Sequence, residues 1–133
     1  MVTFVGSNPS VKNQDPLVAF AGTRSGKILE AWIKKAGADP KDFRYVNVSD
    51  LVTEWNRPLR MCEVNLPQVK ERLKDAGDDI VALGRTSARV LKKLKRAHLE
   101  LPHPSPRNRK LNDPRVVEDT VAELRSFLQC AKS

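Results

Sequence analysis

A histidine in a proline-rich segment is the first residue whose type and setting could do chemistry. His103 lies in the run Pro102-His103-Pro104-Ser105-Pro106, whose prolines exclude both a helix and a central strand. Such a segment forms a rigid loop, and a rigid loop can hold one side chain in a defined position. A neutral imidazole can then donate a hydrogen bond to a developing anion. An ordinary surface histidine in a proline-rich turn explains the same residues equally well.

A second segment places an asparagine between a glycine and a proline. In Gly6-Ser7-Asn8-Pro9-Ser10, Gly6 permits a sharp turn and Pro9 stiffens it. The amide of Asn8 has both a donor and an acceptor, so it can orient a water or a polar ligand. Taken alone, the pattern favours a turn in which this side chain bonds only local backbone.

These two segments must be positioned by regular elements, and strand-like and helix-like runs alternate along the chain. Apolar runs bounded by turn residues predict strands at 2–5, 45–48, 80–84 and 98–101. Apolar residues at helical spacing predict helices at 25–36, 66–76 and 86–96, and a last helix that begins at Asp113-Pro114. A short helical turn is expected at Asp39-Pro40, and an ordered loop at 50–63.

Strands separated by helices predict parallel pairing and right-handed crossovers. We therefore expect the α/β class, with a four-stranded parallel sheet in a three-layer α/β/α arrangement and one domain over residues 1–133. Ligands of such sheets bind beyond the carboxyl ends of the strands. The segments containing Asn8 and His103 follow the first and the fourth strand, so they can face each other at this edge.

The composition favours some classes of protein over others. Lys and Arg number 24 against 16 Asp and Glu, a net charge of +8, which favours a polyanionic partner over a merely soluble basic protein. We expect no membrane span, because no apolar run approaches ~18 residues, and no secretory signal, because residues 1–6 have no basic start followed by a long apolar stretch. Cys62 and Cys130 lie far apart and in no metal-ligand spacing, so we expect free thiols, a reducing compartment and no metal site.

Together, the two loops resemble the paired motifs of the uracil-DNA glycosylase superfamily. Gly-Ser-Asn-Pro-Ser at 6–10 is similar to the first motif, and His-Pro-Ser-Pro-Arg-Asn at 103–108 resembles the second, most closely in the single-strand-selective branch. The middle of the chain instead resembles the thermophile-type iron–sulfur branch. The segments that carry this second resemblance, in order, are 20–26, 36–39, 47–48, 56–58 and 81–84. That branch has four cluster cysteines, which this chain lacks, so we expect no cluster and no other cofactor.

The resemblance implies a monofunctional DNA glycosylase that flips uracil, or a related damaged base, out of DNA and hydrolyses its N-glycosidic bond. It implies two catalytic residues: His103 would stabilise the departing base as an anion, and Asn8 would position the attacking water. It also implies a base-binding set, in which Asn47 reads the base edge and Phe20 stacks on the ring. The alternatives are a buried asparagine that bonds backbone for Asn47 and a core aromatic for Phe20, which explains Phe20 about equally well. The whole base-binding set is Gly6, Ser7, Phe20 and Asn47.

DNA contacts are implied for the segment that follows His103, namely Ser105, Arg107, Asn108, Arg109 and Lys110. Arg107 would fill the gap that the base leaves, while Arg109 and Lys110 would hold phosphates. A solvated basic loop is the alternative. For the further basic run at 92–96 a solvated helix face is the better interpretation. For Thr86 and Ser87, at the start of the same helix, simple caps are the better interpretation and phosphate binding is the alternative.

The expected partner is uracil-containing DNA, single- or double-stranded, with no membrane partner. We expect a monomer in the cytoplasm of a bacterial, archaeal or virus-infected host cell. The alternative function is a non-catalytic protein on the same fold that binds nucleic acid or a modified nucleotide. A generic Rossmann-like nucleotide-binding module ranks lower, because residues 6–10 make a poor phosphate-binding loop.

Overall fold

The structure is a computed structural model that describes residues 2–7, 23–49, 59–76, 79–105 and 108–131. Within these ranges four strands form one parallel sheet in the order β2-β1-β3-β4. The strands are β1 (Thr3–Gly6), β2 (Arg44–Asn47), β3 (Ile80–Leu83) and β4 (Leu99–Leu101). The predicted four-stranded parallel sheet is therefore confirmed.

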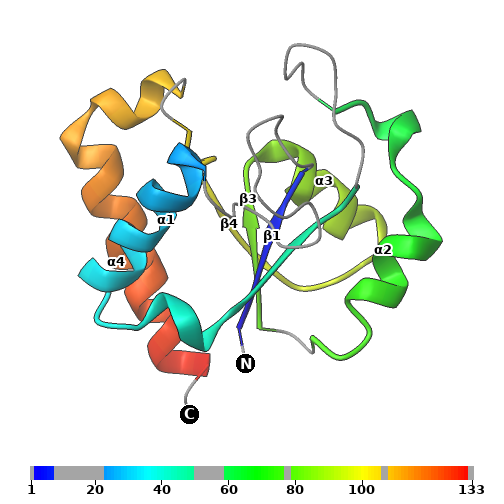
Figure 1. Cartoon of the computed structure of the whole chain (residues 1–133), viewed down its shortest axis with the longest axis horizontal. Coiled ribbons are helices and arrows are strands. Elements are labelled where there is room, and N and C mark those ends of the chain that lie inside the picture. The colour runs from blue at the N-terminus through cyan, green and yellow to red at the C-terminus, as the bar shows by residue number, and fades with distance from the viewer. Residues whose placement is uncertain (1, 8–22, 50–58, 77–78, 106–107, 132–133) are drawn as a thin grey trace.

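Two pairs of helices cover the two faces of the sheet (Figure 1). Helices α1 (Arg24–Lys35) and α4 (Pro114–Ala131) lie on one face, and α2 (Leu66–Arg72) and α3 (Arg85–Lys93) lie on the other. Short 3-10 helices link them at η1 (Pro40–Asp42), η3 (Met61–Glu63) and η4 (Arg109–Asn112). This is the predicted three-layer α/β/α arrangement. No helix in the described ranges is both long and apolar enough to cross a membrane.

The core consists of one apolar cluster on each side of the sheet. Successive strand residues point to opposite faces, so Phe4 packs with the α1–α4 cluster and Val5 with the α2–α3 cluster. Strands β1 and β3 are buried along their whole length. Burial on both faces explains why these strands have continuous apolar runs instead of an alternating pattern.

Two helices end earlier than their apolar spacing predicts. Helix α2 ends at Arg72, and the carbonyl of its C-cap residue, Leu73, accepts a hydrogen bond of 3.0 Å from the Arg96 guanidinium. Helix α3 ends at Lys93, because Lys95 adopts a φ of 56° and leaves the helical conformation. One side chain beyond α3 thus satisfies the end of α2, a contact between segments 23 residues apart.

The interpretation of Thr86 and Ser87 as helix caps is wrong. Helix α3 begins one residue earlier, and its N-cap is Gly84, which has no side chain with which to cap. Ser87 is fully buried, with its hydroxyl 3.5 Å from the Leu83 carbonyl oxygen.

Candidate functional site

The carboxyl ends of β1 and β2 bring three of the predicted base-binding residues together. Gly6 of β1 pairs in register with Asn47 of β2. Beyond them, the Ser49 N–H donates to the Ser7 carbonyl over 3.0 Å, so the two strands stay side by side as they leave the sheet. Gly6, Ser7 and Asn47 therefore lie at one edge, where ligands of parallel sheets bind.

Asn47 is buried, and its side-chain Nδ2 finds no acceptor in the part of the chain that the structure describes. An unsatisfied buried donor costs about 1–3 kcal/mol, so such a group is a candidate for ligand binding. The backbone of Asn47 is held firmly, because the Arg72 guanidinium of α2 donates to its carbonyl over 2.7 Å. Sequence reasoning missed Arg72, and no local pattern signals a contact across 25 residues.

The loop after β4 holds His103 through hydrogen bonds to its carbonyl oxygen. This oxygen accepts from the Ser105 N–H over 2.9 Å and from the Asn108 side-chain amide over 3.0 Å. The Asn108 side-chain oxygen in turn accepts from the Lys110 N–H over 3.2 Å, which caps η4. The Asn108 amide, predicted to contact DNA, is thus used within the loop that carries His103.

The His103 side chain packs on Gly84, the residue that follows β3. Gly84 has a φ of +95°, which favours glycine. A Cβ on Gly84 would lie 3.2 Å from the His103 Cβ and 3.4 Å from its Cδ2. The imidazole is therefore held against backbone. Burial also lowers the pKa of His103 below its ordinary value of 6.5, so the ring is neutral at pH 7.

The sheet spacing sets His103 and Asn47 on either side of β1. His103 lies over the end of β3, and β3 is separated from β2 only by β1. Two inter-strand steps place the two strand ends roughly 10 Å apart. The edge thus combines a donor from Asn47 with a neutral imidazole.

A comparison with protein families adds to this geometry. The family model described as the Uracil DNA glycosylase superfamily matches residues 1–125. The chain belongs to this superfamily. Membership makes it a glycosylase-like protein associated with DNA repair, and it implies that the substrate is DNA. A search of the curated proteins finds no match for this chain.

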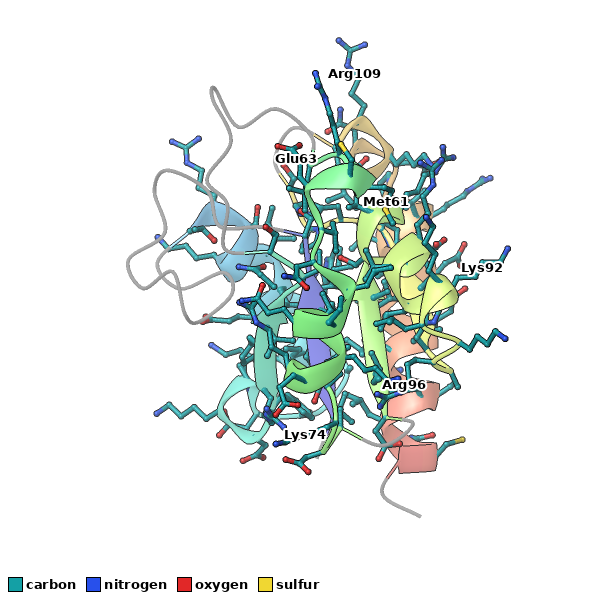
Figure 2. All side chains as sticks on the ribbon, turned by 90° about the vertical axis from the view of Figure 1, so that its right-hand side faces the viewer. Met61, Glu63, Lys74, Lys92, Arg96 and Arg109 are labelled. Carbon is teal, nitrogen blue, oxygen red and sulfur yellow. The ribbon has the colours of Figure 1, made fainter. Side chains whose placement is uncertain are left out.

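The remaining residues that the superfamily motifs predict are only partly described. Arg109 and Lys110 are exposed on η4, and Figure 2 shows Arg109 projecting from the end of the molecule. Ser105 is half-buried. Asn8, Phe20 and Arg107 lie outside the described residues, so their predicted roles stay predictions.

The cluster found in the iron–sulfur branch of the superfamily does not fit this chain. A cubane cluster takes four thiolates, and the chain has only Cys62 and Cys130. Both thiols are exposed, one on η3 and the other near the end of α4. The donor set therefore does not support a cluster.

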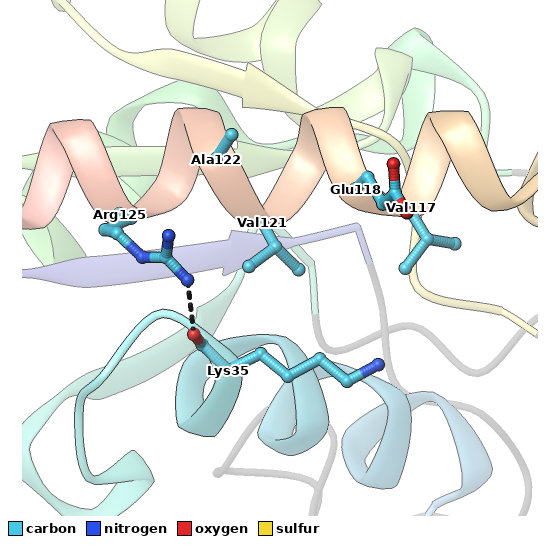
Figure 3. A pocket seen from close by; sticks show the side chains of 6 residues that line it. All are labelled: Lys35, Val117, Glu118, Val121, Ala122 and Arg125. Atoms are coloured by element: carbon cyan, nitrogen blue, oxygen red, sulfur yellow. Dashed lines mark hydrogen bonds between the residues drawn. The ribbon is translucent and has the colours of Figure 1, made fainter.

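A hollow of about 410 Å³ lies between α1 and α4 (Figure 3). One of its edges is closed by a 2.8 Å hydrogen bond from the Arg125 guanidinium to the Lys35 carbonyl. Its described lining is Lys35, Val117, Glu118, Val121, Ala122 and Arg125. None of these is a residue that the superfamily motifs predict for the site, so the candidate site is the strand edge and not this hollow.

The lowered pKa of His103 predicts how stability depends on pH. In the interval below pH 6.5 the unfolded chain binds a proton at this position that the folded chain does not, so the free energy of unfolding falls as the pH falls. This contribution is fully present well above pH 6.5, and it is lost as the pH falls through 6.5 toward the lowered pKa of the folded state. His103→Gln should flatten the slope below pH 6.5 in urea unfolding measured across that pH. An identical slope in both proteins would contradict the lowered pKa.

Proposed function

We propose that this protein hydrolyses the N-glycosidic bond of uracil, or of a closely related damaged base, in DNA. The observation that carries the proposal is the neutral His103 held on Gly84 at the strand edge where the buried Asn47 Nδ2 has no acceptor among the described residues, in a member of the uracil DNA glycosylase superfamily. These are the two kinds of group that a departing pyrimidine requires.

The chemistry explains why a neutral imidazole suits the reaction. As the bond breaks, positive charge develops on the sugar and negative charge on the departing base. His103 donates a hydrogen bond to a carbonyl oxygen of that base, worth about 2–4 kcal/mol in the transition state. The target base leaves the helix to reach this group, because no side chain can approach it inside a duplex.

The other roles follow from the same transition state. Asn8 orients the attacking water through its amide oxygen, which is too weak a base to deprotonate it. Asn47 donates to one uracil carbonyl and accepts from the ring N–H. Cytosine presents the opposite pattern and leaves these groups unpaired, which excludes it. Phe20 stacks on the flipped ring.

Contacts with the DNA backbone complete the proposed site. Arg109 and Lys110 bind phosphates from η4, with Ser105 beside them, and Arg107 occupies the space that the base vacates. The exposure of Arg109 and Lys110 supports this assignment.

The test is a labelled oligonucleotide with one uracil, given to the protein as a single strand and as a duplex, followed by alkali to cut at any abasic site. We expect cutting at the uracil and none in the matched cytosine oligonucleotide. Cutting at another damaged base in place of uracil would change the assigned base and keep the reaction. Salt-sensitive binding without cutting would contradict the proposal and favour the non-catalytic alternative.

Gly84→Ala tests the seat of His103. The added Cβ forces His103 to move by a few tenths of an ångström, and we expect excision to slow about tenfold. Alanine at this positive φ is also strained, so the variant should be less stable than the wild type by about 1–2 kcal/mol. Gly37→Ala is the matched control, because Gly37 has a φ of +87° and nothing within 4 Å. Gly37→Ala should lower the free energy of unfolding in urea by a similar amount and leave the rate of excision unchanged. Equal slowing of excision in both variants would show that Gly84 does not position His103.

A further inference from the structure

The outward face of α3 is basic along its whole length. Of its nine residues, Arg85, Arg89, Lys92 and Lys93 are basic and exposed, and none is acidic. Their spacing puts them on one side of the helix, opposite the side that packs on the sheet. Figure 2 shows Lys92 projecting outward from this face. We call these four side chains the α3 ridge.

The carboxylates of the described residues do not compensate the charge of the α3 ridge. No ion pair involves a ridge side chain in the described part of the chain. Helix α4, by contrast, carries three acidic residues against two arginines. The net charge of +8 is therefore spread unevenly over the molecule. Uncompensated cations attract a polyanion. When the two associate, counterions condensed on the polyanion are released, and this release favours binding.

The α3 ridge starts at the candidate site and leads away from it. Helix α3 follows Gly84, on which His103 packs, so Arg85 lies at the carboxyl edge of the sheet. From there to Lys93 the helix extends about 12 Å, at 1.5 Å per residue. A strand that leaves the site can follow this face past several phosphates, which are spaced about 3.4 Å apart along the axis of one duplex strand.

We propose that the α3 ridge binds the phosphate backbone of a nucleic acid beside the segment held at the site. An acidic protein is the other polyanion to consider, but protein interfaces are built around aromatic and apolar anchors. The exposed positions of the ridge offer only cations, which suit a repeating phosphate chain and carry no sequence preference. The role of the ridge in holding a substrate strand rests on the proposed function, whereas its binding of nucleic acid does not.

The test compares two triple variants of equal charge. The ridge variant is Arg89→Gln, Lys92→Gln, Lys93→Gln, which spares Arg85 beside the site. The control variant is Lys34→Gln, Lys35→Gln, Lys41→Gln, whose residues are all exposed. The control also removes two last-turn lysines from α1, as the ridge variant does from α3, so the loss of favourable helix-dipole interactions is matched. Affinity for an undamaged single strand is measured across a series of salt concentrations.

We expect the ridge variant to bind more weakly, with a slope of log K against log salt smaller in magnitude by about 2, since each lost phosphate contact contributes about 0.7. The control should keep most of the wild-type slope. Equal slopes in the two variants would overturn the proposal. The proposal would also be overturned if the ridge variant kept the wild-type salt slope but was no longer retained on a polyglutamate column, because the ridge would then bind an acidic protein.

The salt-slope measurement and the cutting assay test the ridge and the glycosylase activity independently. If the ridge variant has a smaller salt slope than the control while the wild-type protein cuts no uracil strand, the ridge binds nucleic acid and the glycosylase assignment is wrong. If the wild-type protein cuts the uracil strand and the salt slopes of the two variants are equal, the glycosylase assignment is correct and the ridge proposal is wrong. With both proposals correct, the ridge variant has a raised KM on a long uracil strand and an unchanged kcat. A short oligonucleotide that covers only the site should show no difference.

Discussion

His103→Ala is expected to slow excision of uracil about 10²–10³-fold, the loss seen when one preorganised donor to a developing anion is removed. The effect belongs to the chemical step, so kcat should fall and KM should change little. Single-turnover cutting of the uracil oligonucleotide, with enzyme in excess, measures this step directly. Because His103 lies in the loop after β4 and packs on a glycine, its removal should leave the fold intact.

The control for this variant is the other histidine of the chain. His98 precedes β4, and its Nδ1 lies 2.9 Å from the Arg96 carbonyl. His98→Ala removes an imidazole of the same size and should leave single-turnover excision unchanged. Comparable losses in the two variants, or no loss in His103→Ala, would remove His103 from its catalytic role.

Asn47→Leu is expected to lower excision at least about 10²-fold, because two hydrogen bonds to the base are lost and each is worth about 1–3 kcal/mol when a polar partner is left unpaired. The same change should leave stability equal or higher, since it replaces a buried Nδ2 that has no acceptor among the described residues. Loss of function with a gain of stability is the mark of a group retained for a ligand. Single-turnover excision and urea unfolding are measured on the same protein sample.

Thr3→Val is the matched control for this trade-off. Thr3 Oγ1 is the other buried side-chain atom without a partner in the described ranges, and Thr3 lies at the opposite end of β1 from Gly6. Replacing its hydroxyl by a methyl group should stabilise the protein and leave excision unchanged. If Asn47→Leu destabilises the protein strongly while Thr3→Val does not, Asn47 is a structural residue and its role in reading the base is wrong.

Local sequence patterns predicted most of the architecture. Alternating apolar runs and helical spacings predicted the order of the elements, and hence the parallel sheet, because parallel neighbours require crossovers. The apolar face of α4 is an example: helical spacing places Val117, Val121, Leu124 and Leu128 on one side, and of these Val121, Leu124 and Leu128 are buried while Val117 is partly buried against the same cluster. The motifs at 6–10 and 103–108 predicted the superfamily, to which the match over residues 1–125 assigns the chain.

The element boundaries were predicted less well, for a physical reason. Apolar spacing continues past the ends of α2 and α3, so it cannot show where a helix stops. Helix α3 ends before Lys95, whose φ is 56°, and the end of α2 is satisfied by Arg96, which donates to the Leu73 carbonyl from 23 residues away. Such a bond depends on how two helices pack, and packing is not a local property of the sequence.

The sequence by itself determined the elements, their order and the residue types delivered to the carboxyl edge of the sheet. Tertiary structure decided how those residues are held. Gly84 receives the His103 ring, Arg72 fixes the backbone of Asn47, and Asn108 ties the loop that carries His103. The first two contacts join segments far apart in the chain. Each requires its two groups to be placed to within a few tenths of an ångström, and only the packed fold sets that placement.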